Sequence, residues 1–259
     1  MKKILCATVF GCVVAATSSA TAADVSPIQA TARPYGLQPF APVYMSGSDA
    51  RAADFNANAL PFFLELINQH LAETANFTGR DGFKLDASRL FLRTQSDKPI
   101  RVYFVHEGAG YHNSLGFSMT PAGSEQPGQQ HLIFPDASFN GTFSTYRNAD
   151  NPLVVGDFVE LGLGGPGIQL DFFCVANGAG KPYTYGGTTI FGIWHNDKER
   201  NSDGLQHAVA FLLPDSPYLL IGFEDINGGG DLDYNDCLFV VDIGEVNAKD
   251  LFDDSTLPN

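Results

Sequence analysis

Positive charge is scarce in this chain. Its 259 residues contain 15 Lys and Arg against 29 Asp and Glu, which gives a formal net charge of −14. A protein with this charge is repelled by nucleic-acid phosphates and by anionic membrane surfaces, and it attracts cations instead. We therefore expect no nucleic-acid partner, and a cation is the partner that the composition favours.

Long apolar runs are also scarce. The main one, residues 4–16, follows Lys2 and Lys3 and precedes Ala20-Thr21-Ala22. It is too short for a transmembrane helix, and this order of segments is typical of a secretory signal peptide, residues 1–22, cleaved after Ala22. No later run is long enough to span a bilayer. We expect an exported protein without a transmembrane anchor, periplasmic or extracellular in a bacterium.

Cysteine is nearly absent from the expected mature chain. Of four cysteines, Cys6 and Cys12 lie in the signal peptide, while Cys174 and Cys237 each lie in an apolar run. An oxidising compartment permits a disulfide between the latter two. Two buried thiols acting as small hydrophobic residues are the alternative. The sequence leaves both possibilities open.

Common catalytic motifs are missing. The sequence contains no H-E-x-x-H, no G-x-S-x-G, no S-x-x-K and no P-loop. Glu224 and Asp225 could form a glycosidase pair, but as neighbours on a strand they would point to opposite faces. We therefore expect a protein that is not an enzyme, and a secreted hydrolase remains as an alternative.

Turn residues and short apolar runs dominate the mature chain. Residues 23–50 predict an extended lead-in, and a helix is expected over about residues 58–73, with Asn58 as its N-cap. Ten short strand-like runs follow, and together they predict a single domain, residues 51–259, with a jelly-roll-like two-sheet β-sandwich fold of the all-β class. The runs are residues 89–94, 100–106, 114–120, 130–134, 157–163, 169–176, 188–194, 205–213, 218–224 and 237–243.

The most informative segment is residues 222–242, GFEDINGGGDLDYNDCLFVVD, which contains no Lys or Arg. Carboxylates this close repel one another unless a cation lies among them, and Ca²⁺ suits carboxylate, amide and carbonyl oxygens. An EF-hand would need Gly at the sixth position and flanking helices, whereas Asp236 stands there between apolar strand-like runs. The candidate ligands are Glu224, Asp225, Asp231, Asp233, Asn235 and Asp236.

Two carboxylates outside this segment are secondary candidates, and one histidine is not. Asp203 precedes the run 205–213, and Glu107 directly follows the run 100–106, so both carboxylates could reach the same rim as outer metal ligands. His207 lies within a strand-like run, and we interpret it as a core or rim histidine rather than a ligand.

Aromatic residues offer a further possibility. Tyr183, Tyr185 and the single Trp, Trp194, lie near Gly-rich turns. Exposed rings beside an ion could stack on a sugar, while packing in the core or in the turns is the alternative that we favour.

The segment FEDINGGGDLDYND resembles the FED…GGD-x-D-[YF]-N-D signature of the bacterial domain-of-unknown-function family 4114. The segments starting at Glu107 (E-G-A-G-Y) and Asn201 (N-S-D-G, then His207) are similar to two further family segments, so the resemblance spans about residues 86–244. It implies an exported β-rich domain with calcium sites, found in some large adhesins, and it implies no enzymatic activity.

The sequence thus predicts a calcium-binding β-sandwich in which the ion rigidifies acidic loops at one end. A calcium-dependent carbohydrate-binding, adhesion or matrix module, with a glycan or a surface component as its partner, is the alternative.

Overall fold

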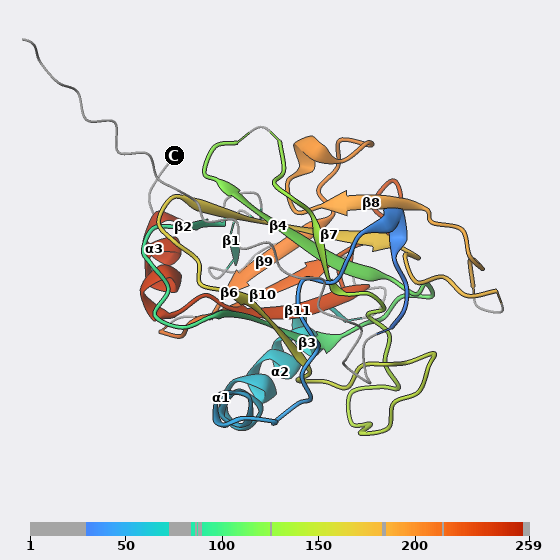
Figure 1. Cartoon of the computed structure of the whole chain (residues 1–259), viewed down its shortest axis with the longest axis horizontal. Coiled ribbons are helices and arrows are strands. Elements are labelled where there is room, and N and C mark those ends of the chain that lie inside the picture. The colour runs from blue at the N-terminus through green and yellow to red at the C-terminus, as the bar shows by residue number, and fades with distance from the viewer. Residues whose placement is uncertain are drawn as a thin grey trace, which may run out of the picture.

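The computed structural model describes residues 30–72, 84–85, 87, 90–124, 126–182, 185–213 and 215–255. The expected signal peptide and Tyr183 lie outside these residues. The described part is an all-β sandwich of two antiparallel sheets, which confirms the predicted fold class (Figure 1).

One sheet has six strands in the order β1-β9-β10-β11-β3-β6. The other has the order β2-β7-β4-β5, and β8 pairs with β7 as a fifth strand. A strand lies within or largely overlaps each of the ten expected runs, whereas β1 was not predicted. The strands are β1 (Lys84–Leu85), β2 (Phe91–Leu92), β3 (Ile100–His106), β4 (Ser114–Pro121), β5 (His131–Phe134), β6 (Phe158–Gly162), β7 (Ile168–Ala176), β8 (Gly192–His195), β9 (Ala208–Leu212), β10 (Tyr218–Phe223) and β11 (Cys237–Asp242).

The main core lies between the two sheets. Phe172 of β7 and Phe239 of β11 meet there with ring centroids 5.1 Å apart, and both side chains are fully buried. Removing aromatic surface of this kind from water is the main driving force for stacking the sheets.

The N-terminal helix is longer than predicted. α1 (Ala50–Asp54), a π-helical turn η2 (Phe55–Ala59) and α2 (Leu60–His70) run on without a break. Asp49 caps the start by accepting a hydrogen bond from the Ala52 backbone N–H at 2.8 Å, so the assignment of Asn58 as N-cap is wrong. The wide π turn ends at Ala59, two residues before Pro61, which has no N–H to donate to the helical ladder.

This helix covers the outer face of the six-stranded sheet and forms a second core with it (Figure 1). Phe55 stacks on Tyr103 of β3 with ring centroids 3.9 Å apart, and both side chains are fully buried. The central strands of the sheet therefore face apolar cores on both sides. This explains why their sequences are apolar throughout instead of alternating with polar residues.

The C-terminal helix α3 (Glu245–Ser255) was not predicted, because its sequence is polar. It packs on the main core through Ala248 and Leu251, and Asn247 accepts hydrogen bonds from the backbone N–H groups of Arg93 and Thr94. Short 3₁₀ turns, η1 (Pro34–Gly36) and η3 (Lys198–Arg200), complete the described elements. None of the described helices is long and apolar enough to cross a membrane.

Cys174 of β7 and Cys237 of β11 are free thiols buried in the main core. A hydrogen bond with Cys237, together with burial, raises the pKa of Cys174. Of the two possibilities that the sequence left open, the structure shows the pair of buried thiols.

Candidate metal centre

The acidic loop closes the hairpin between β10 and β11. Phe223, the last residue of β10, pairs with Cys237, the first residue of β11, and the Asp236 N–H donates to the Phe223 carbonyl at 3.1 Å. Five residues of the loop have positive φ: Gly228, Gly229, Gly230, Leu232 and Tyr234. A non-glycine residue in this conformation costs about 1–2 kcal/mol. The loop therefore winds tightly and stores strain, as functional loops often do.

This winding brings five carboxylates together in two groups. The carboxylate oxygens of Glu224, Asp231 and Asp233 lie within 4.8 Å of one another, and so do those of Glu224, Asp225 and Asp236. The expectation that Glu224 and Asp225 point to opposite faces was wrong, because β10 ends at Phe223 and the alternation of a strand no longer applies.

Glu224 belongs to both groups and is fully buried. Within the part of the chain that the structure describes, neither of its carboxylate oxygens has a hydrogen-bond donor. The Asp236 carboxyl lies within reach, but an ionised carboxylate has no proton to donate. Burial, and next the charges of Asp231 and Asp225, raise the pKa of Glu224 to about 7. A buried carboxylate of this kind must either bind a cation or take up a proton.

Asp225 and Asp236 hold each other in place. The Asp225 N–H donates to Asp236 Oδ2 at 2.8 Å, and Asn113 Nδ2 donates to Asp225 Oδ2 at 2.6 Å. Burial raises the pKa of both carboxyls, and the charges of Asp225 and Glu224 raise that of Asp236 further. These two carboxylates therefore also favour a positive charge between them.

Asn235 positions its neighbour Asp233. Its side-chain nitrogen donates to Asp233 Oδ2 at 2.9 Å and to the Leu71 carbonyl, at the end of the helix, at 3.3 Å. Its carbonyl accepts from the Gly108 N–H at 3.0 Å. These contacts link the acidic loop to the helix and to the segment that follows β3, and the predicted role of Asn235 as a ligand stays a prediction.

The two outer candidates are not part of either carboxylate group. Asp203 Oδ2 accepts from the Gly228 N–H at 2.9 Å and lies 2.9 Å from His207 Nε2. The other ring nitrogen, His207 Nδ1, lies 2.9 Å from the Glu224 carbonyl oxygen. Asp203 and His207 thus support the Gly-rich half of the loop. Glu107 is half-buried beside Gly108.

Trp194 lies beneath the loop rather than on the surface. Only 1% of it is exposed, its ring stacks on His207 with centroids 4.1 Å apart, and its Nε1–H donates to the Asp225 carbonyl at 2.7 Å. It is therefore a support and not a sugar platform, in line with the core packing that the sequence favoured. Sequence reasoning missed its role and that of Asn113, because only the fold brings β8 and β4 to this loop.

An exposed aromatic stack does lie at the same rim. Tyr111 stacks between Tyr185 and Phe191 with ring centroids 5.4 and 4.8 Å away. Tyr185 is 73% exposed and Phe191 is 45% exposed. Burial raises the pKa of Tyr111, and the charges of Tyr185, Asp225 and Asp236 add to the shift. The stack is therefore close enough to the acidic loop for the charges of the loop to affect the pKa of Tyr111.

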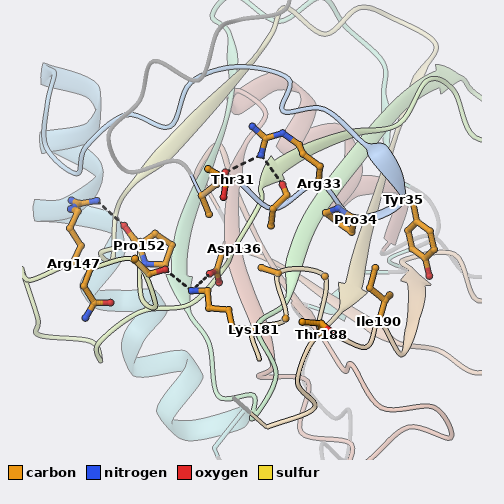
Figure 2. A pocket seen from close by; sticks show the side chains of 17 residues that line it. Thr31, Arg33, Pro34, Tyr35, Asp136, Arg147, Pro152, Lys181, Thr188 and Ile190 are labelled. Carbon is orange, nitrogen blue, oxygen red and sulfur yellow. Dashed lines mark hydrogen bonds and ion pairs between the residues drawn. The ribbon is translucent and has the colours of Figure 1, made fainter. Parts of the chain in front are cut away.

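A cavity of about 760 Å³ lies elsewhere, between residues 30–35 and the loop that follows β7 (Figure 2). Figure 2 shows Lys181 inside it, with Nζ 3.1 Å from the buried Asp136 Oδ2. Arg147, on another wall, pairs with Asp157 at 2.5 Å. These cations are engaged by the protein itself, so the cavity is a weaker candidate for a charged ligand than the acidic loop.

One family model matches the part of the chain that contains the acidic loop. Residues 165–244 match the family described as Domain of unknown function (DUF4114). The DUF4114 match contains Asp203 and the whole loop between β10 and β11, whereas Glu107 and Asn113 precede it. No curated protein and no solved structure matches the chain.

Proposed function

We propose that this protein is an exported calcium-binding β-sandwich in which the ion rigidifies the acidic loop between β10 and β11. The observation that carries the proposal is Glu224, a fully buried carboxylate without a hydrogen-bond donor among the described residues, at the meeting point of two carboxylate groups. A buried anion in this position is costly on its own and is stabilised by a cation.

Calcium fits these donors better than zinc or magnesium. The groups consist of oxygen ligands alone, whereas structural zinc sites use Cys and His. Mg²⁺ usually keeps several of its waters, which a ligand as deeply buried as Glu224 disfavours. Ca²⁺ accepts six to eight oxygens in irregular geometry, and loop carbonyls can supply those that the carboxylates do not.

Removing calcium is expected to lower the melting temperature. Extracellular modules bind calcium with a Kd of about 10⁻⁴–10⁻³ M, and an ion at ten times its Kd adds about 1.4 kcal/mol to the free energy of unfolding. Thermal unfolding followed by circular dichroism, in calcium and in excess chelator, measures the shift. Magnesium at the same concentration is the control for ionic strength. An equal melting temperature in all three conditions would rule out the proposal.

Calcium-dependent carbohydrate binding, in an adhesion or matrix module, is the second candidate function. The stack of Tyr111, Tyr185 and Phe191 favours it, because it presents an exposed ring face within electrostatic reach of the carboxylates. In such a site a sugar ring would pack on the aromatic face while its hydroxyls coordinate the ion.

Glycan binding is expected to require both calcium and Tyr185. A glycan array probed with the whole protein should show hits in calcium that disappear in EDTA, and Tyr185→Ala should reduce them by tenfold or more. Tyr146→Ala is the matched control, because Tyr146 is similarly exposed, at 67%, but is not part of the stack. If the array shows no hits in calcium, carbohydrate binding is wrong and the role of the ion is structural only. If the hits persist in EDTA, the ion takes no part in binding the glycan.

A further inference from the structure

The five carboxylates of the acidic loop do not form one group around a single point. Two Ca–O bonds of 2.3–2.6 Å bring two oxygens on the same ion to within about 5 Å of each other. Each carboxylate group meets this limit, with oxygens within 4.8 Å, but the five carboxylates fall into two groups that share a single member. The carboxylates therefore form two adjoining positions, each of which can bind one ion.

We propose that the β10–β11 loop binds two calcium ions, bridged by the carboxylate of Glu224. This inference rests on the calcium-binding function proposed above and specifies how many ions that site holds.

Glu224 has the properties of a bridging ligand. Both of its oxygens lack a donor among the described residues, so one is available to each ion. Oε1 lies under the backbone of Gly230, only 2.0 Å from where a Cβ would stand, next in sequence to Asp231 of the first group. The other members of the second group, Asp225 and Asp236, flank the loop ends at β10 and β11.

The charge of the cluster agrees with two ions. The five carboxylates carry five formal negative charges, and one divalent cation offsets fewer than half of them. A second ion leaves a single excess negative charge, which a partly solvated site tolerates far better than three.

The two positions differ in their access to water. Asp231 is exposed, so the ion that it shares with Glu224 and Asp233 lies near the surface and can complete its coordination with water or with a ligand hydroxyl. Asp225 is only 2% exposed and Asp236 is half-buried, so the ion between them is more enclosed. We call these the outer and the inner ion. The outer ion should exchange faster and bind more weakly, because fewer of its ligands are preorganised by the protein.

Counting the bound calcium tests the inference directly. Equilibrium dialysis of the full protein against millimolar calcium, with atomic absorption as the readout, is expected to give two ions per chain. Asp231→Asn should weaken the outer ion by tenfold or more and leave one tightly bound ion. Asp236→Asn should remove the inner ion and retain the outer one. Asp97→Asn, an exposed aspartate in the loop before β3, is the control for the loss of charge and should keep both ions.

The possible outcomes separate the two proposals. A wild-type stoichiometry of one overturns the two-ion inference but leaves calcium binding in place, whereas zero overturns calcium binding itself. Loss of all bound calcium in both Asp231→Asn and Asp236→Asn, with both variants folded by circular dichroism, also indicates one shared ion. The wild-type count needs no substitution, so the test is informative even if a variant fails to fold.

Discussion

Replacing Glu224 with Gln is expected to abolish the response to calcium and to stabilise the ion-free protein. Gln has the shape of Glu but no charge, so it removes a buried anion that Asp225, Asp231 and Asp233 repel. It also supplies an amide that can donate to these carboxylates. We expect the ion-free free energy of unfolding to rise by an amount on the order of 1 kcal/mol, and the gain from calcium to fall from about 1.4 kcal/mol to none.

The measurement is urea unfolding of wild type and variant, each in calcium and in chelator. Glu199→Gln is the matched control, because it makes the same chemical change at an exposed residue of η3 and should alter neither value. If Glu224→Gln destabilises the ion-free protein and keeps the full response to calcium, then Glu224 is not a ligand and the proposed site is wrong.

The pH dependence of the stability of the ion-free protein also tests the role of Glu224, because the direction of the expected change is known. The folded protein raises the pKa of Glu224 from 4.5 to about 7, so the folded state binds a proton more tightly than the unfolded chain. The contribution of Glu224 to stability is therefore greatest at low pH and is lost as the pH rises through this window. In chelator, the Glu224→Gln variant should lose this part of the pH dependence.

Replacing Gly230 with Ala is expected to be the most damaging small substitution in the loop. An added Cβ would stand 2.0 Å from Glu224 Oε1 and 3.4 Å from the Cβ of Ile226, at a backbone φ of +47°. Either the loop or the central carboxylate must move. We expect a loss of about 3 kcal/mol in calcium, from backbone strain of about 1–2 kcal/mol plus the ion-binding energy that a displaced Glu224 forfeits.

Gly228→Ala separates the two causes. Gly228 also has positive φ, +87°, but an added Cβ there meets no atom within 4 Å. The Gly228→Ala variant should lose only the stability that backbone strain costs, about 1–2 kcal/mol, and it should keep its response to calcium. Thermal unfolding of both variants, with and without calcium, measures the difference. Equal losses and equal calcium responses in the two variants would mean that the space under Gly230 is not needed to hold Glu224.

Much of the fold could be predicted because strands of this kind are marked locally. Apolar runs bounded by Gly, Pro, Asn and Asp predicted ten strands, and the structure has a strand in each of these regions. For β3 the predicted range agrees at both ends. The predicted start of the helix was wrong. Helix propensity alone places the start near Pro61, whereas the cap by Asp49 and the π turn before Pro61 allow the helix to begin earlier. α3 was missed because only two of its described residues, Ala248 and Leu251, pack on the main core.

For the site, the sequence alone determined which side chains are available: a loop between two apolar strands with many carboxylates, three glycines and no basic residue within it. The carboxylates are close together in the sequence, and this was enough to predict that they need a cation. Like charges repel more strongly the closer they are. The central role of Glu224, the two-group arrangement and the supporting contacts of Asn113 and Trp194 were decided only by the tertiary structure. These features depend on burial and on contacts across strands distant in sequence, and both arise only when the two sheets and the helix pack together.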